Sequence, residues 1–160
     1  MSERTVLQTQ SGATLAISAS LPVTYDAAGY GATGITYTVA GQIESFGSYG
    51  VRANTSTFTA IADAVVQKFK GSKDYGNASF VIGYLPSDAG QDLIETAVES
   101  QNRYSVKITY PMGAGEATNE IHYLDVLVTM REFSGGSVDE VRKLSVDFAI
   151  CRKPVIVAAT

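Results

Sequence analysis

The stretch "ASFVIGYLPSDAGQDLIETAVESQNRYSVKITYP", residues 78–111, decides the fold, because it joins two strand patterns through one helix. Residues 78–85 are rich in apolar and β-branched side chains and stop at Pro86, which cannot donate to a sheet. Asp88 follows as a predicted helix N-cap, and Gln91 stands where a capping box returns a hydrogen bond. The stretch therefore predicts a strand, a sharp stop and a capped helix.

The helix itself is amphipathic. Its apolar face carries Leu93, Ile94, Ala97, Val98 and Gln101. Its acids, Asp92, Glu95 and Glu99, fall elsewhere, as expected for a helix that lies over a sheet with its charges in solvent. We expect the helix to end near Asn102, and the strand "RYSVKITY" to occupy 103–110.

Period-two patterns on either side of this unit predict further strands. They cover 14–21, 35–46, 56–62, 64–70, 120–133 and 139–151. The strands at 35–46 and 56–62 are expected to form a long hairpin. The fold class is therefore mainly β, a β-rich α+β arrangement: an antiparallel β-sandwich or partly open barrel flanked by one α-helix. We expect a single domain over 1–160.

The segment "GYGATG", residues 29–34, fits the spacing of a dinucleotide-binding loop. That motif requires a strand before it and a helix that opens from its last glycine. Here Gly34 is followed by the alternating pattern of a strand, and Asp26 leads into the glycines. We therefore expect a turn or loop rather than a phosphate site.

Composition excludes several classes of protein. The 160 residues carry 18% charged and 45% hydrophobic side chains, with a net charge of −4, which disfavours a surface that grips nucleic acid phosphates. We expect neither a signal peptide nor a membrane span. A lone Cys151 and a lone His122 give no disulfide and no zinc set, so no metal or cofactor is expected.

No set of titratable residues converges in the sequence as a catalytic centre would. His122 shares a strand face with apolar residues and is expected to be packed, and Cys151 to be a small buried or boundary residue. Glu116 and Glu120 are expected to be surface acids. We predict no enzyme.

Lys68, Lys70 and Lys73, with Phe69 and Tyr75 between them, have two interpretations. They faintly match a single-strand nucleic acid stripe. In an acidic chain, such lysines more often form a solvated edge or pair with a neighbour's acids, and they discourage wrong strand pairing.

Three stretches resemble the major tail tube proteins of long-tailed, non-contractile bacteriophages, the lambda-like ones among them. They are residues 23–50, residues 68–111 and the closing pair of strands. The resemblance lies in the series of strand, proline, "SDAGQDLI" helix and "RYSVKITYP" strand, with a long hairpin before the end. Relatives can carry an extra immunoglobulin-like domain after this unit, which we do not expect here.

The resemblance implies a self-assembling structural subunit. Hexameric rings would stack into a tube, each subunit giving about four strands to an inner barrel through which double-stranded DNA passes without stable binding. Implied partners are further copies of the chain, a tape-measure protein, a tail terminator and distal tail proteins, with no membrane. The implied location is the virion tail, assembled in the host cytoplasm.

Candidate subunit and ring contacts follow from the loop at 46–54, from the lysines and from the apolar tail. They are Phe46, Gly47, Ser48, Tyr49, Gly50, Val51, Arg52, Lys68, Lys70, Lys73, Val155, Ile156 and Val157. Residues 1–12 and 152–160 are expected to be arms that become ordered on assembly. Asp125, Glu132 and Asp147 are candidates to face the lumen, with ordinary surface as the alternative.

Two alternatives remain open at this point. The chain could be a related ring-forming protein, such as a tail terminator or the tube protein of a type VI secretion system. It could also be a nucleotide enzyme that uses "GYGATG", which would require saturable nucleotide binding.

Overall fold

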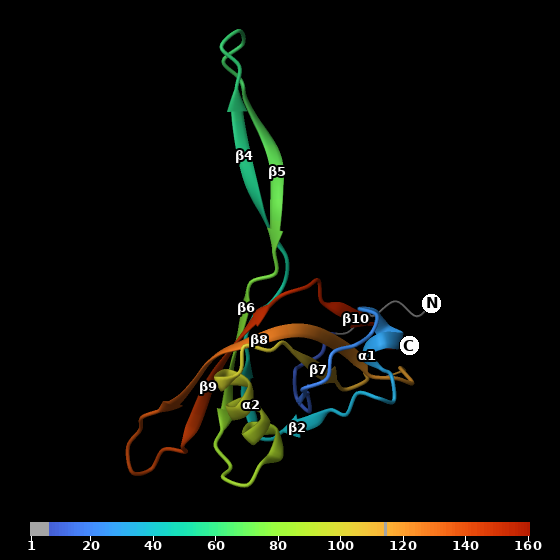
Figure 1. The fold of residues 1–160 in the computed structure, drawn as a ribbon, viewed down its shortest axis with the longest axis vertical. Coiled ribbons are helices and arrows are strands. Elements are labelled where there is room, and N and C mark those ends of the chain that lie inside the picture. Colours follow the sequence, from blue (N-terminus) through green and yellow to red (C-terminus); the bar gives the residue numbers. More distant parts are fainter. Residues whose placement is uncertain (1–6, 114) are drawn as a thin grey trace.

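The computed structural model describes residues 7–113 and 115–160, and its fold is mainly β (Figure 1). The strands are β1 Thr14–Ser18, β2 Thr38–Ala40, β3 Ile43–Phe46, β4 Arg52–Thr59, β5 Val66–Asp74, β6 Asn77–Gly83, β7 Tyr104–Tyr110, β8 Glu120–Ser134, β9 Lys143–Ile150 and β10 Val155–Val157. The helices are α1 Ala27–Tyr30 and α2 Ala89–Glu99.

One antiparallel sheet forms the body, in the order β2-β1-β7-β8-β9-β6-β3, with β10 added beside β8. The end strands β2 and β3 are consecutive in sequence, joined only by Gly41 and Gln42. Two strands so closely linked can lie at opposite ends of one sheet only if the sheet curls. The result is a partly open barrel, which confirms the predicted fold class.

The single strand predicted over 35–46 is thus two strands, β2 and β3. Gln42 interrupts the pattern with a positive φ of 60°, and the Gly41 amide donates to Asp88 Oδ2 at 3.2 Å. The period-two pattern runs through this corner without a break, which is why the sequence predicted one strand.

The core lies inside the curl of the sheet. On β9, Leu144, Val146, Phe148 and Ile150 are all buried, as their alternation predicted. Phe80 of β6 is 0% exposed and packs against Phe148 with ring centroids 5.1 Å apart. The sheet therefore provides most of a continuous apolar core, to which Ile94 and Ala97 of α2 also belong.

Helix α2 packs against β1, β2 and β8 and starts where the sequence predicts. Asp88 Oδ2 accepts from the Gln91 amide at 3.0 Å, which confirms the cap. The Gln91 side chain does not return the bond. It is buried, where Oε1 accepts from the Leu85 amide and Nε2 donates to the Gly83 carbonyl, tying the helix to the end of β6.

A second, short helix was not predicted. Residues 27–30 of the "GYGATG" region form α1, capped by Asp26, whose Oδ1 accepts from the Gly29 amide at 2.7 Å. A Cβ on Gly29 would overlap the carbonyl of Thr24, so this glycine allows a close approach of two backbone segments. Tyr30 is buried and stacks on Tyr123 of β8, with centroids 5.2 Å apart.

Strands β4 and β5 form a separate two-stranded hairpin that projects away from the body (Figure 1). The sequence predicted a hairpin between 35–46 and 56–62, and that pairing is wrong: the partner of β4 is β5. Strand β5 also runs through Gly71 to Asp74, where the sequence predicted a loop after Lys70.

Candidate assembly interface

The β4–β5 hairpin has two chemically different faces, both in solvent. Directly paired residues share a face, so the register places Phe58 and Phe69 on one side and Lys68 and Lys70 on the other. Phe58 and Phe69 are 59% and 53% exposed. Every residue of β5 is exposed. The hairpin is an amphipathic ribbon that no segment within residues 7–113 and 115–160 covers.

The segment 46–51 anchors this hairpin to the body. Phe46 packs edge-on against Phe80, with centroids 5.7 Å apart. A Cβ on Gly47 would overlap the backbone of Ser79, whereas one on Gly50 would meet nothing within 4 Å. Val51 is 59% exposed. The backbone of the segment is therefore closely packed at Gly47 and no longer packed against the body at Gly50, just before the hairpin begins.

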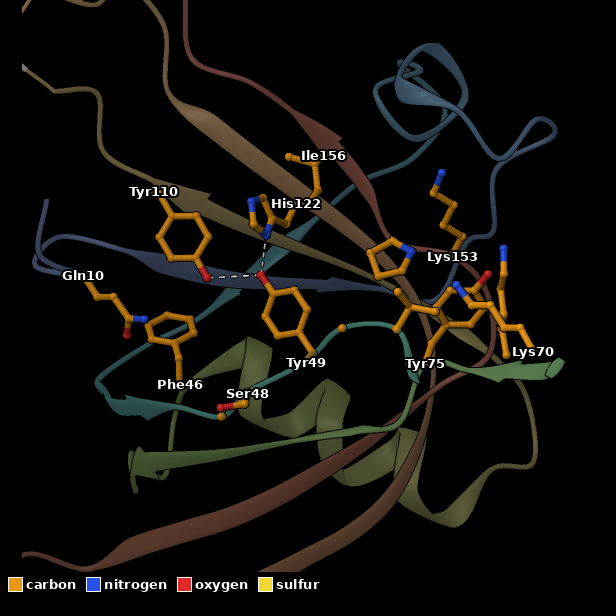
Figure 2. A pocket seen from close by; sticks show the side chains of 15 residues that line it. Gln10, Phe46, Ser48, Tyr49, Lys70, Tyr75, Tyr110, His122, Lys153 and Ile156 are labelled. Carbon is orange, nitrogen blue, oxygen red and sulfur yellow. Dashed lines mark hydrogen bonds between the residues drawn. The ribbon is translucent and has the colours of Figure 1, made fainter. Parts of the chain in front are cut away.

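A pocket of about 740 Å³ opens at the base of the hairpin, between the anchor segment, β5, β8 and the C-terminal segment (Figure 2). Phe46, Tyr49, Tyr75, Tyr110 and Ile156 provide its aromatic and apolar lining. Lys70, Lys73 and Lys153 also line it. The sequence had singled out two of these lysines but had not brought them together with Tyr110 or Lys153.

One wall of the pocket is a chain of hydrogen bonds. His122 Nε2 lies 2.7 Å from Glu120 Oε1, Tyr49 Oη bonds His122 Nδ1, and Tyr110 Oη lies 3.1 Å from Tyr49 Oη. A carboxylate can only accept, so His122 Nε2–H donates to Glu120, and the hydroxyls of Tyr49 and Tyr110 continue the chain from Nδ1. Burial and the bond to Tyr110 raise the pKa of Tyr49, so it stays protonated. His122 is packed, as predicted, and serves to position Tyr49.

The C-terminal segment belongs to the body. Val155, Ile156 and Val157 pair with β8 as β10, and the Thr160 carbonyl accepts from the Thr118 amide at 3.2 Å. The sequence predicted an arm over 152–160 that would become ordered on assembly. The structure differs because β8 offers these residues a free strand edge within the same chain. Of the N-terminal arm predicted over 1–12, residues 1–6 lie outside the described residues.

Asp125 cannot line a lumen, which corrects the prediction. Its side chain is 0% exposed, and its Oδ2 accepts from Arg103 Nη1 at 2.9 Å and lies 3.2 Å from Arg152 Nε. The Arg152 guanidinium in turn sits 3.9 Å from the ring centroid of Tyr25. Burial raises the pKa of Asp125, and the two arginines oppose that shift. Asp125 thus links strand β8 to Arg103, just before β7, and to Arg152, at the start of the C-terminal segment.

Glu132 and Asp147 lie on the outer face of the sheet, opposite to the core. Residues Lys143, Ser145, Asp147 and Ala149 alternate with the buried residues of β9, and Glu132 pairs with Ser145. Ser79 and Val81 continue this face on β6. Four adjacent strands, β8, β9, β6 and β3, thus present a mostly small and polar surface. Glu132 is exposed and Asp147 half-buried.

The remaining candidates do not form a reactive centre. Cys151 is exposed rather than buried or at a boundary as predicted, because it lies just past the end of β9. Among residues 7–113 and 115–160, no group of three or more His, Cys, Asp or Glu side chains could hold a metal ion. No helix in the described part of the chain is long and apolar enough to cross a bilayer.

Comparison with solved structures defines the class of fold. A chain of the PVC sheath/tube terminator of an extracellular contractile injection system matches with a TM-score of 0.67 and 9% identity, over 96% of this chain and 98% of that one. A chain of the six-fold symmetrised anti-feeding prophage baseplate matches with a TM-score of 0.65 and 9% identity, over 99% and 98%.

The SPP1 tail tube matches with a TM-score of 0.62 and 12% identity, over 90% of this chain and 75% of that one. No protein-family model and no curated protein matches the sequence. The chain therefore has the tail tube fold. None of these three structures is described as an enzyme.

Proposed function

We propose that this chain is a structural subunit of a tail tube, which many identical copies build by self-assembly. The observation that carries the proposal is the β4–β5 hairpin. Isolated two-stranded hairpins are marginally stable in water, and exposed strand edges pair with other chains. A hairpin with exposed Phe58 and Phe69 gains stability when a second copy covers it.

The proposed interface combines the hairpin with its base. It comprises the anchor segment (46–51), Arg52 at the start of β4, the lysines Lys68, Lys70 and Lys73, and the β10 edge from Val155 to Val157. Ile156 is 60% exposed on that edge. The lysines follow β5 along the projecting hairpin, and the anchor segment lies at its base, which suits contacts within or between stacked rings (Figure 1).

The outer face of β8, β9, β6 and β3 is the proposed lumen wall. Six copies with four strands each give 24 strands, and at ~4.8 Å per strand the circumference is ~115 Å and the diameter ~37 Å. Glu132 and Asp147 would face this lumen. Duplex DNA carries a phosphate charge every ~1.7 Å, so a wall without clustered cations lets it slide rather than bind.

The finer assignment is a long-tailed, non-contractile, lambda-like phage, with hexameric rings that conduct double-stranded DNA during ejection. Its support is the sequence resemblance and the likeness to the SPP1 tail tube. The proposed partners are a tape-measure protein, a tail terminator and distal tail proteins, without a membrane. The proposed location is the virion tail, after assembly in the host cytoplasm.

A tube terminator is the second candidate, and the match to the PVC terminator over 96% of this chain favours it. The tube protein of a type VI secretion system is a related alternative. A terminator forms one ring and stops, whereas a tube subunit stacks rings repeatedly. The length of the assemblies separates these two functions.

Negative-stain electron microscopy of the purified chain over a concentration series tests the proposal. We expect rings and tubes for the natural chain and none for the double variant Phe58→Asp/Phe69→Asp, because both charges would be buried at the interface. Val23→Asp is the matched control, since Val23 is 98% exposed on the body. Solitary particles at every concentration would refute the proposal.

A further inference from the structure

The pocket at the base of the hairpin carries three lysines, and none of its lining residues among those described is a carboxylate. The lysines are Lys70, Lys73 and Lys153. In the part of the chain that the structure describes, none of these three lysines forms an ion pair. The floor beneath them is aromatic and apolar, with Tyr49, Tyr75 and Ile156.

A second surface has the opposite character. The turn between β8 and β9, residues 135–142, is called the β8–β9 tip here. Val138 and Val141 are 101% and 71% exposed, and Asp139 and Glu140 stand between them. The Ser137 amide donates to Glu140 Oε2 at 2.8 Å, which gives the tip a defined turn. Two apolar side chains and two acids thus extend together from the body.

The tip and the base of the hairpin, where the pocket residues lie, are at opposite ends of the body (Figure 1). Strand β9 runs from one to the other, from Lys143 beside the tip to Ile150 near the C-terminal segment. A chain therefore cannot insert its tip into its own pocket, but it can insert it into the pocket of another copy. The acids of the tip are complementary in charge to the lysines of the pocket, and both surfaces carry exposed apolar groups.

We propose that the β8–β9 tip of one copy docks into the hairpin-base pocket of a second copy. Val138 and Val141 would cover the aromatic floor of the pocket. Asp139 and Glu140 would meet Lys70, Lys73 and Lys153. Such a contact removes apolar surface from water and pairs charges that are otherwise exposed.

This contact joins two different surfaces, so it is heterologous. Heterologous contacts repeat from copy to copy and generate a ring or an open stack, unlike a self-complementary dimer contact. The inference rests on the proposed self-assembly and adds to it a named contact and a direction. The competing occupants of a cationic aromatic pocket are a free anion or an anionic segment of another protein, and the test below separates them.

Site-specific cross-linking tests the contact. Two proteins, Asp139→Cys and Lys73→Cys, both carrying Cys151→Ser, are mixed before assembly and then oxidised. We expect a disulfide-linked dimer of the two species in the mixture. Thr33→Cys, at an exposed residue far in sequence from both surfaces, replaces Asp139→Cys as the control and is expected to give at least about tenfold less dimer.

Electron microscopy of the same samples keeps the outcomes distinct. Rings or tubes without a cross-link above the control level would overturn the docking contact and leave the self-assembly intact, as expected if another molecule occupies the pocket. Samples without any assemblies would overturn both proposals.

Charge reversal gives an independent readout. Asp139→Lys and Lys73→Glu should each raise the concentration needed for assembly about tenfold, which corresponds to about 1.4 kcal/mol. The chain that carries both substitutions should return to near the natural value, because the pair is restored with inverted signs. Failure of the double variant to recover would overturn the pairing.

Discussion

Strands β5 and β7 lie in opposite environments. Both are antiparallel strands that combine lysine with aromatic residues. In β7, Tyr104, Ser105, Val106 and Ile108 are buried, whereas every residue of β5 is exposed. The comparison shows that a local sequence pattern can predict a strand but does not predict which other surface, if any, packs against that strand. The body of this protein supplies its own core, whereas in our proposal another copy of the chain covers the hairpin.

The largest expected difference between the two regions is in the free energy of unfolding of the unassembled chain. Phe80→Ala removes a ring that is 0% exposed and should destabilise the body by about 3–5 kcal/mol. Phe69→Ala is the matched change in the hairpin, where the ring is 53% exposed, and should cost less than about 0.5 kcal/mol. Urea unfolding measures both, and equal costs would break the distinction.

The anchor segment sharpens the boundary between the two regions. Gly47→Ala places a Cβ against the backbone of Ser79 and should cost about 1–3 kcal/mol through displaced backbone. Gly50→Ala, three residues closer to the hairpin, meets no atom within 4 Å and should leave the melting temperature nearly unchanged. Similar melting temperatures for the two variants would show that the segment is not anchored at Gly47.

A substitution at Asp88 tests whether the stability of the body is independent of the hairpin. Its carboxylate caps α2 and also accepts from the Gly41 amide at the corner between β2 and β3. Asp88→Ala should therefore destabilise the chain by about 1–2 kcal/mol. The adjacent Ser87→Ala serves as the control. Thermal unfolding by circular dichroism measures the loss of stability that Asp88→Ala causes. That loss should be the same in the unassembled natural chain and in the unassembled Phe69→Ala variant.

The smallest expected effect is the pH dependence of α1. The hydrogen bond from the Gly29 amide lowers the pKa of Asp26. A lowered pKa means that its stabilising effect is present above the ordinary pKa of Asp and is lost as the pH falls through the folded value. Acidification should loosen α1 before the hairpin changes, and NMR signals of Tyr30 report this. Asp26→Asn should remove that pH dependence.

Sequence reasoning succeeded where the signal was local. The Asp88 cap, the burial of Ile94 and Ala97 on α2 and the alternation of β9 each depend on a few neighbouring residues, whereas the helix ends at Glu99 and leaves Gln101 exposed beyond it. It failed at Gly41 and Gln42, where one continuous pattern crosses a corner, and at the pairing of β4 with β5. Register and partner choice depend on contacts far apart in the chain.

The candidate site shows the same limit. The contact role of the loop at 46–54 was inferred from the family resemblance and the lysines were singled out from charge, but residues 52–54 of that loop belong to strand β4. The pocket was not, because its lining comes from segments as distant as Gln10 and Ile156. Asp125 was placed on the correct outward face, but Arg103 and Arg152 cover it from two other segments. The alternation of a strand predicts on which face of the sheet a side chain lies, but it does not predict which other segments cover that face.

The central claim is that the β4–β5 hairpin is incomplete until another copy of the chain covers it. Hydrogen exchange, followed by mass spectrometry on unassembled and assembled protein, tests this most directly. We predict that amides of 52–59 and 66–74 exchange rapidly in the unassembled chain and at least about a hundredfold more slowly after assembly, while amides of β7 change little. Slow exchange of the hairpin before assembly, or no added protection after it, would contradict the account.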